Sequence, residues 1–446
     1  MNPTPYGTAC RFVDSFIHEG KRAPARSQRS AYWGLRLETM GALMHQLGEP
    51  HRAFASVHVG GTSGKGSVSA FIASVLQAAG YRVGLHTTPY LQSPREKYIV
   101  NGELIGQNDF VDTVCRLTPA LTEVGRRFPG YHPSYAQVST ALAFQHFAAQ
   151  AVDIAVVEVS VGGRFDFTNV LMPQVAVVTN IGLDHANAIG PTIEDIAWHK
   201  AGIIKAGGPV VSGVTDPRAA GVVAVEAAQA GAPLFRSGFD FHCIPSTCIP
   251  STAGPTKGRF DWERPNGPGY RDLQISMHGD HQVGNAGLSV AAVDTLRAAG
   301  FPVDERALRI GLNQALIPGR LEIVQHRPTV VLDGAHNTEK IRTLVAALRG
   351  MFGIRPLTVV LGVGAAKDAA GIVAMLAQHT VHVVCTEASV RGKPAVSAGE
   401  LAGLVAALGV VGEAVADPYL AVERAMRLAG SNGVVCITGS LYLVGQ

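Results

Sequence analysis

A short glycine-rich segment carries the clearest chemistry in this sequence. Residues 61–67 read Gly-Thr-Ser-Gly-Lys-Gly-Ser and lie between a strand pattern at 55–60 and a helix pattern. Glycine lets the backbone curl so that successive N–H groups face one anion, and the positive end of the helix dipole points the same way. We therefore predict a phosphate-binding loop made of Gly61, Thr62, Ser63, Gly64, Lys65, Gly66 and Ser67.

The spacing of this loop differs from the common P-loop pattern, because Gly66 separates Lys65 from Ser67. An ordinary glycine-rich turn between a strand and a helix is the alternative interpretation. A lysine inside such a turn, directly before an amphipathic helix, favours phosphate binding, since the ammonium can reach the β- and γ-phosphates.

Three more residues could do chemistry. Glu158 closes an apolar strand pattern at 153–159. The carboxyl end of a strand in an α/β sheet faces the ligand crevice, and Mg²⁺ prefers oxygen ligands. Glu158 is therefore a candidate magnesium ligand. Taken alone, His185 is simply explained as a turn residue and Lys200 as a solvated helix lysine.

The elements that must position these residues alternate between strand and helix patterns. After the loop, apolar residues recur three and four apart from Val68 to Ala79, which predicts a helix that ends near Gly80. Strands are predicted at 153–159 and 175–181, and Thr192 with Asp195 resembles a capping box. Residues 243–269 are rich in proline and glycine, which indicates a surface loop or a short β excursion.

A junction is predicted at residues 317–320, after which the alternation restarts. Strand patterns follow at 329–332, 357–363, 381–385 and 434–437, and a helix pattern includes Ile341 and Leu348. This predicts an α/β protein with two domains, 1–314 and 315–446. The first is a P-loop domain with a mainly parallel sheet, and the second is a smaller Rossmann-like α/β domain.

Composition bounds the classes of function. The chain has 446 residues, of which 47% are hydrophobic and 16% charged, so it can bury a sizeable core. A net charge of +3 is too small to indicate a nucleic-acid or anionic-membrane partner. Six scattered cysteines without metal-ligand spacing suggest free thiols in a reducing compartment. We expect a cytoplasmic protein, and we interpret the basic residues of the first 50, Arg36 among them, as a solvated surface.

A set of ordered segments resembles the folylpolyglutamate synthase and dihydrofolate synthase family of the Mur ligase superfamily. The glycine loop resembles the family's GTNGKGS. Segments 84–91, 95–102, 158–169, 179–185 and 196–203 resemble its GLFTSPHL, RERIxING, EVGLGGRLDATN, TxIGLDH and IAxxKAGI motifs, and 281–286, 318–320 and 333–337 complete the series. The resemblance implies a Mur-ligase-like fold for both domains.

The resemblance also implies a reaction. ATP phosphorylates an acid to an acyl phosphate, the amine of L-glutamate attacks it, and ADP and phosphate are released. The implied acid is dihydropteroate, a tetrahydrofolate polyglutamate, or both. The implied partners are these small molecules, and the expected state is a monomer.

Roles for individual residues follow from the resemblance. It implies Mg²⁺ ligands at Thr88, Glu158 and His185, and a carbamylated Lys200 that holds a second Mg²⁺. The resemblance assigns the glycine loop to ATP. Asn285, Arg320 and Asp333 are further implied ATP contacts, and His336 is expected to position the nucleotide or phosphate. The implied catalytic set is Glu158, His185, Lys200 and His336. Because Arg320 and Asp333 would reach ATP from the second domain, we expect a hinge near 313–320.

The implied acid-binding residues depart from the family pattern. They are Ser134, Tyr135, Ala136, Gln137, Phe165, Asp166 and Phe167. Gln137 stands where the family often has a carboxylate, and the two phenylalanines replace smaller residues. The alternatives left open are a Mur-type ligase for a non-folate acid and a P-loop nucleotide switch. Glu158, His185 and Lys200 argue against the switch.

Overall fold

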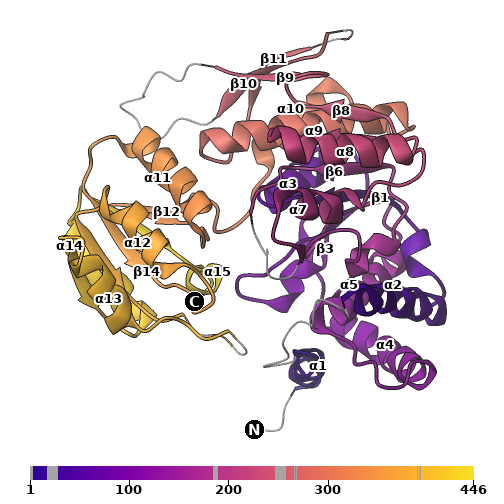
Figure 1. The fold of residues 1–446 in the computed structure, drawn as a ribbon, viewed down its shortest axis with the longest axis horizontal. Helices are drawn as coiled ribbons and strands as arrows, with labels where there is room; N and C mark the ends of the chain where they lie inside the picture. Colours follow the sequence, from indigo (N-terminus) through magenta and orange to yellow (C-terminus); the bar gives the residue numbers. More distant parts are fainter. Residues whose placement is uncertain are drawn as a thin grey trace. The chain divides into compact units, whose positions relative to one another are not determined.

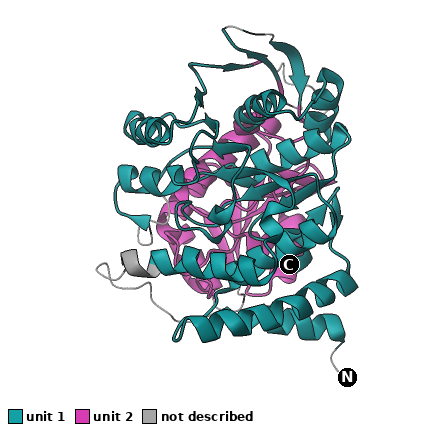
Figure 2. Cartoon of the chain, turned by 90° about the vertical axis from the view of Figure 1, so that its right-hand side faces the viewer, with its two compact units in different colours: residues 1–244, 260–274, 284–315 teal, residues 245–259, 275–283, 316–446 magenta. Residues whose placement is uncertain are grey.

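The computed structural model describes residues 4–17, 29–183, 189–246, 258–265, 267, 269–388, 390 and 393–446, with only the backbone for 29–32. The chain divides into two compact units (Figure 2). Unit 1 comprises residues 1–244, 260–274 and 284–315, and unit 2 comprises 245–259, 275–283 and 316–446. Each unit is built on its own α/β sheet, so the predicted fold class is confirmed.

Unit 1 contains an eight-stranded sheet in the order β4-β3-β2-β5-β1-β6-β7-β8 (Figure 1). From β2 to β8 the neighbouring strands pair parallel, whereas β2-β3 and β3-β4 pair antiparallel. The strands are β1 (Ala55–Gly60), β2 (Val83–His86), β3 (Ile99–Val100), β4 (Glu103–Leu104), β5 (Ile154–Glu158), β6 (Val175–Val178), β7 (Val210–Ser212) and β8 (Leu234–Arg236).

Helices cover this sheet because its strands are buried and apolar on both faces. One core cluster packs side chains of β5 against α1, α2, α4 and α5, and another packs β6 and β7 against α7 and α8. Helix α3 also packs against β5, and α10 packs against α3. The helices are α1 (Pro5–Asp14), α2 (Arg29–Gln46), α3 (Lys65–Ala78), α4 (Gln107–Arg127), α5 (Tyr135–Ala149), α7 (Ile193–Ala201), α8 (Pro217–Gln229), α9 (Asp280–Ala298) and α10 (Glu305–Gln314).

Three further strands form a small sheet in the order β11-β10-β9. They are β9 (His242–Pro245), β10 (Arg259–Glu263) and β11 (Tyr270–Gln274). The buried Trp262 anchors this sheet by donating from Nε1 to Gly287 O at 3.2 Å. Of the two interpretations of residues 243–269, the β excursion is correct where the chain is described, and residues 247–257 lie outside it.

Unit 2 contains a six-stranded sheet in the order β12-β13-β17-β14-β15-β16, in which β12 pairs antiparallel and its other neighbours pair parallel. The strands are β12 (Glu322–His326), β13 (Thr329–Leu332), β14 (Leu357–Leu361), β15 (His382–Cys385), β16 (Val411–Ala414) and β17 (Val434–Thr438). The helices are α11 (Thr338–Phe352), α12 (Ala369–Ala377), α13 (Ala398–Ala406), α14 (Pro418–Ala429) and α15 (Leu441–Val444).

Three one-turn 3₁₀ helices, η2 (Pro50–Arg52), η3 (Pro94–Lys97) and η4 (Phe167–Val170), lie in unit 1. The cysteines within the described residues, Cys10, Cys115, Cys243, Cys385 and Cys436, are free thiols. Across the described part of the chain, every helix is too short or too polar to cross a lipid bilayer.

Both sheets gather their candidate site residues at one edge. In unit 1 the carboxyl ends of β1, β2, β5 and β6 lead to the glycine loop, to Thr88, to Glu158 and to Thr179. In unit 2 the carboxyl ends of β13 and β14 lead to Asp333 and Gly362. Ligands of open α/β sheets bind outside this edge.

Candidate active site

The glycine loop follows β1 directly, and its last three residues, from Lys65 on, form the start of α3. Gly61 and Gly64 have φ angles of 139° and 80°. A Cβ on Gly61 would lie 1.9 Å from Thr179 Oγ1, and one on Gly64 would lie 2.4 Å from Asn285 Oδ1. Only glycine fits these two positions, for both conformational and steric reasons.

Hydrogen bonds from the end of β6 hold the loop in shape. Thr62 N donates to Asn180 O at 2.9 Å, Ser63 N donates to Asn180 Oδ1 at 2.7 Å, and Thr179 Oγ1 donates to Ser63 O at 2.6 Å. Ser63 Oγ is buried and has no hydrogen-bond partner among the described residues. A buried hydroxyl without a partner fits a phosphate oxygen as its acceptor.

Lys65 and Glu158 face each other at the carboxyl edge. Lys65 Nζ lies 3.9 Å from Glu158 Oε1, and both side chains are largely buried. The other carboxylate oxygen, Glu158 Oε2, accepts from the backbone N–H of Thr88 at 3.0 Å. Residues that are far apart in the sequence thus place a cation, a carboxylate and a threonine around one point.

Lys200 is buried rather than solvated, which corrects the interpretation drawn from the sequence alone. Its Nζ donates to Gly61 O at 2.7 Å, so α7 delivers an amine to the back of the glycine loop. The predicted capping box of Thr192 and Asp195 starts this helix and fixes its register. A carbamylated Nζ keeps one N–H, so this hydrogen bond is compatible with the modification.

The described residues fit a metal ion only in part. No group of three or more histidine, cysteine, aspartate or glutamate side chains that could hold a metal occurs among them. Glu158 supplies hard oxygen atoms of the kind Mg²⁺ takes, and Lys200 would supply more only when carbamylated. The predicted ligand His185 lies outside the described residues.

Asn285 is the ATP contact predicted from α9, and its side chain lies against Gly64. Ser289, one turn further on, donates to Asn285 O at 2.8 Å and also approaches Val68 O at 3.4 Å. These contacts hold α9 against α3 beside the loop.

In unit 2, the carboxylate of Asp333 accepts hydrogen bonds from backbone N–H groups. Its oxygens accept from Leu321 N at 3.0 Å and from Ala335 N at 2.8 Å. Burial raises the pKa of Asp333, and the neighbouring Arg320 acts against that rise. Asp333 thus shapes the 333–337 loop, and its predicted ATP contact stays a prediction.

Both ring nitrogens of His336 are engaged. Nδ1 lies 2.9 Å from Gly334 O, and Nε2 lies 3.3 Å from Lys340 Nζ. Burial lowers the pKa of His336 to about 3, and the nearby cations of Lys340, Lys367 and Arg320 add to the effect. The ring is therefore neutral, and Lys340 is a residue that the sequence analysis did not single out.

The first group of predicted acid-binding residues lies at the start of α5. Ser134 Oγ accepts from Gln137 N at 3.4 Å and so caps the helix. Gln137 is fully buried: its Oε1 accepts from Tyr131 Oη at 2.7 Å and its Nε2 donates to Thr39 Oγ1 at 3.5 Å. The Lys97 ammonium lies over the ring of Tyr135, 5.1 Å from its centroid, and Ala136 packs against the core.

The second group surrounds η4. Asp166 caps this turn, because its Oδ1 accepts from the N–H and the hydroxyl of Thr168 at 3.0 and 2.6 Å. Phe165 stacks on Trp33 of α2, with ring centroids 5.3 Å apart and planes 20° apart. Arg36 lies 4.3 Å above the Phe167 ring.

Sequence reasoning missed the part that α2 plays here. Arg36 is half-buried over an aromatic ring, so it is not part of a solvated surface. The signal was available, since Trp33 and Arg36 are three residues apart and therefore share one face of a helix.

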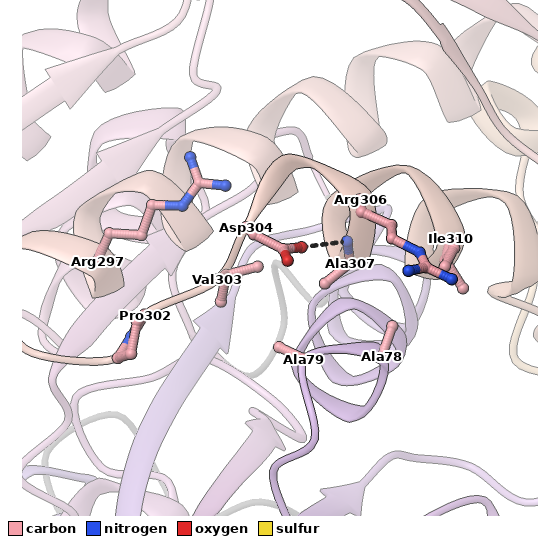
Figure 3. Close-up of a pocket in the computed structure, with 9 residues that line it drawn as sticks. All are labelled: Ala78, Ala79, Arg297, Pro302, Val303, Asp304, Arg306, Ala307 and Ile310. Atoms are coloured by element: carbon pink, nitrogen blue, oxygen red, sulfur yellow. Dashed lines mark hydrogen bonds between the residues drawn. The ribbon is translucent and has the colours of Figure 1, made fainter.

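A separate cavity of about 750 Å³ lies in unit 1 between the end of α3 and the start of α10 (Figure 3). Asp304 caps α10 there by accepting from Ala307 N at 2.7 Å. The lining residues are Ala78, Ala79, Arg297, Pro302, Val303, Asp304, Arg306, Ala307 and Ile310. None of the predicted site residues lines it, so this cavity is separate from the glycine loop.

Comparison with known proteins defines the class first. Residues 59–293 match the Mur ligase middle domain, and residues 319–441 match the Mur ligase glutamate ligase domain. The fold, together with the glycine loop before α3, is that of a Mur ligase.

Full-length relatives then define the family. The chain is 36% identical to the dihydrofolate synthase/folylpolyglutamate synthase of Bacillus subtilis, with 92% of this chain and 93% of that protein covered. The folylpolyglutamate synthase of Mycobacterium tuberculosis complexed with ADP has a TM-score of 0.87 and 30% identity, covering 99% and 97%. Escherichia coli FolC in complex with DHPP and ADP has a TM-score of 0.84 and 26% identity, covering 99% and 96%. The chain belongs to the folylpolyglutamate synthase and dihydrofolate synthase family.

Proposed function

We propose that this protein is an ATP-dependent ligase that joins L-glutamate to a folate-type acid, with an acyl phosphate intermediate and release of ADP and phosphate. The acid is dihydropteroate, a tetrahydrofolate polyglutamate, or both. One observation carries the proposal: Lys65, Glu158 and Lys200 converge on the glycine loop at the carboxyl edge of the unit 1 sheet. Family membership and the ADP and DHPP complexes of the relatives support it.

The loop residues account for the handling of phosphate. The ammonium of Lys65 and the N-terminus of α3 stabilise negative charge on the transferred phosphoryl group. The hydroxyl of Ser63 offers a donor to a phosphate oxygen. Because the loop is held by Asn180 and Thr179, these groups need little rearrangement when ATP binds.

Magnesium and the modified lysine are further parts of the proposal. Glu158 and the hydroxyl of Thr88 would hold one Mg²⁺, and a carbamylated Lys200 would hold a second. When bound, these ions would neutralise charge on the phosphate oxygens. His185 stays a predicted ligand of the first ion.

The proposal also includes further ATP contacts, the domain boundaries and the state of the protein in the cell. Asn285, Arg320 and Asp333 are proposed ATP contacts, and residues 1–314 and 315–446 stay the proposed domain boundaries. We also propose that the protein is a cytoplasmic monomer that acts on small molecules and binds neither nucleic acid nor membranes, as its composition indicates.

A second candidate is a Mur-type ligase for a non-folate carboxylic acid. Two features favour it: Gln137 is neutral where the family often has a carboxylate, and Phe165 is covered by the Trp33 ring. Both would change the shape and polarity of an acid pocket in this region.

Glutamate-dependent ADP release separates these candidates. Purified full-length protein is given ATP, Mg²⁺ and L-glutamate with dihydropteroate, with tetrahydrofolate, or with unrelated aromatic and aliphatic acids. We expect ADP release that needs both a pterin acid and glutamate, and a product one glutamyl residue heavier by mass spectrometry. Release with a non-folate acid alone favours the second candidate, and hydrolysis that no acid or amine stimulates contradicts both.

A further inference from the structure

Three cations surround the 333–337 loop of unit 2. Burial has the largest effect on the pKa of His336, and the positive charges of Lys340, Lys367 and Arg320 lower it further. Lys340 lies in the first turn of α11, Lys367 lies in the segment after β14, and Arg320 precedes β12. All three side chains are partly buried. The carboxylate of Asp333 interacts with Arg320 and Lys340, so one negative charge offsets part of the charge of the three cations.

The Arg320 guanidinium lies directly against the loop backbone. A Cβ on Gly334 would come within 2.7 Å of Arg320 Nη1 and within 2.2 Å of Leu441 Cδ2. Glycine at 334 therefore permits the close approach of a cation to the loop. The backbone at Gly334 thus leaves room for the guanidinium of Arg320.

Hydrogen bonding decides which nitrogen of His336 carries the proton. Gly334 O can only accept, so Nδ1 carries the hydrogen and donates it. Lys340 Nζ can only donate, so Nε2 presents its lone pair and accepts. The neutral ring has no proton left to give to a phosphate, and its Nε2 instead holds the Lys340 ammonium in place.

The place of Lys340 in its helix is electrostatically unfavourable. Its backbone N–H is capped by Asn337 Oδ1 at 2.9 Å, which puts it in the first turn of α11. The positive end of the helix dipole lies there and disfavours a lysine. A chain that keeps a cation at such a position, with two more cations against the one carboxylate of Asp333, gains when a further anion binds.

We propose that Lys340 binds an oxyanion of the ligase reaction and that His336 is a positioning residue that aims its ammonium. The proposal rests on the proposed function and adds a binding residue to it. The candidate oxyanions are a phosphate group of ATP and a carboxylate of the incoming glutamate. The acid also carries a carboxylate, and a rise in the KM of the acid alone would contradict the proposal. The experiment below separates them.

The first arm measures kinetics. Lys340→Gln removes the charge, Lys340→Arg keeps it, and Arg342→Gln is the matched control, because Arg342 is an exposed cation on the same helix. Loss of a charge-assisted hydrogen bond predicts a rise in the KM of one oxyanion substrate of about tenfold or more. A rise for ATP identifies the phosphate, and a rise for glutamate identifies the carboxylate. Lys340→Arg should recover most of the loss, and the control should match the wild type.

The second arm tests the positioning role with a double-mutant cycle. His336→Leu removes the acceptor for Lys340, so alone it should raise the same KM as Lys340→Gln does. Added to Lys340→Gln, it should change that KM little further, because the ammonium it positions is already gone. Additive effects would overturn the positioning role of His336.

The third arm does not depend on turnover. Calorimetric titration of the full chain with MgATP and with L-glutamate should show about tenfold weaker binding of one of them to Lys340→Gln. Unchanged KM values and unchanged affinities, in a variant with a wild-type melting temperature, would overturn the proposal. A wild-type enzyme that binds these anions without glutamate-dependent ADP release would instead contradict the proposed function.

Discussion

The carboxyl edges of the two sheets use the same topology with opposite arrangements of charge. In unit 1 the ammonium of Lys65 faces the carboxylate of Glu158 at 3.9 Å. In unit 2 the carboxylate of Asp333 is turned onto backbone N–H groups, and cations gather around the neutral His336. The first arrangement suits a phosphate group together with a metal ion, and the second suits a bare oxyanion. A parallel sheet provides the position, and the side chains at its edge decide which ligand fits.

Glycine also serves the two edges differently. Gly61 and Gly64 are required by positive φ angles, so the loop itself has an unusual backbone. Gly334 is required because Arg320 and Leu441 approach it closely. In unit 1 the glycines permit an unusual backbone conformation, whereas in unit 2 Gly334 leaves room for a cation beside the backbone.

The largest expected effect comes from Lys65→Ala. Without the ammonium, charge on the transferred phosphoryl group loses its stabilisation, and we expect ADP release to fall by about 10³-fold or more. Arg218→Ala, which removes an exposed charge elsewhere in unit 1, is the control. A Lys65→Ala variant with turnover near that of the wild type would remove the distinction between the two edges, since unit 1 would then not be the phosphate site.

Lys200→Ala should have the next largest effect. The variant loses both the hydrogen bond to Gly61 O and any carbamate, and we expect activity to fall by about 10²-fold. Short carboxylic acids such as formate or acetate should restore part of it by supplying the missing oxygen ligands. Lys200→Arg can donate to Gly61 O but cannot be carbamylated, so it should stay inactive. Full activity of Lys200→Arg would show that Lys200 serves only to hold the loop, and full activity of Lys200→Ala would show that neither role is needed.

The sequence predicted some of the regular, buried elements and few of the contacts between distant residues. The strand at 55–60 and the capping box of Thr192 and Asp195 appear as expected, because apolar patterning and capping are local signals. Strands β12 and β16 were missed, since both lie at sheet edges and none of their residues is fully buried. The short strands β2 and β7 were missed although most of their residues are buried. Lys340, whose role depends on tertiary contacts, had no distinguishing local pattern of its own.

Acid should destabilise unit 1 more than unit 2. Burial lowers the pKa of His58 and His86 to about 3 and contributes most to lowering those of His146 and His199 to about 4, all in unit 1, whereas in unit 2 the pKa of His336 is lowered to about 3. Below pH 6.5 the unfolded chain takes up protons that these folded histidines do not, so the free energy of unfolding falls as pH falls. The loss is up to about 1.4 kcal/mol per pH unit for each histidine, and it is absent above about pH 7.5.

Hydrogen exchange read peptide by peptide at pH 7.5 and pH 5 measures this difference. Peptides of β1, β2 and α5 should lose more protection than those of β13 and β14. His58→Gln should make the pH dependence shallower, because it removes one of the titrating groups. Equal losses in the two units would contradict the prediction.

The smallest expected effect concerns the binding of the acid in unit 1, which separates an acid pocket from the anion sites at the two sheet edges. Trp33 stacks on Phe165, and its ring packs edge-to-face with the ring of His199, with centroids 4.5 Å apart. His199 directly precedes Lys200 in the chain. If these rings line the acid pocket, Trp33→Ala should raise the KM of the acid by roughly fivefold to twentyfold, because one aromatic contact is lost, and leave the KM of ATP unchanged. Trp33→Phe keeps a ring at this position and should recover most of the loss. Lys340→Gln should show the converse pattern, with an unchanged KM for the acid. Should Trp33→Ala leave the acid's KM unaltered at an unchanged melting temperature, the Phe165 region would not be the acid pocket, and the acid would have to bind elsewhere along the edge of unit 1.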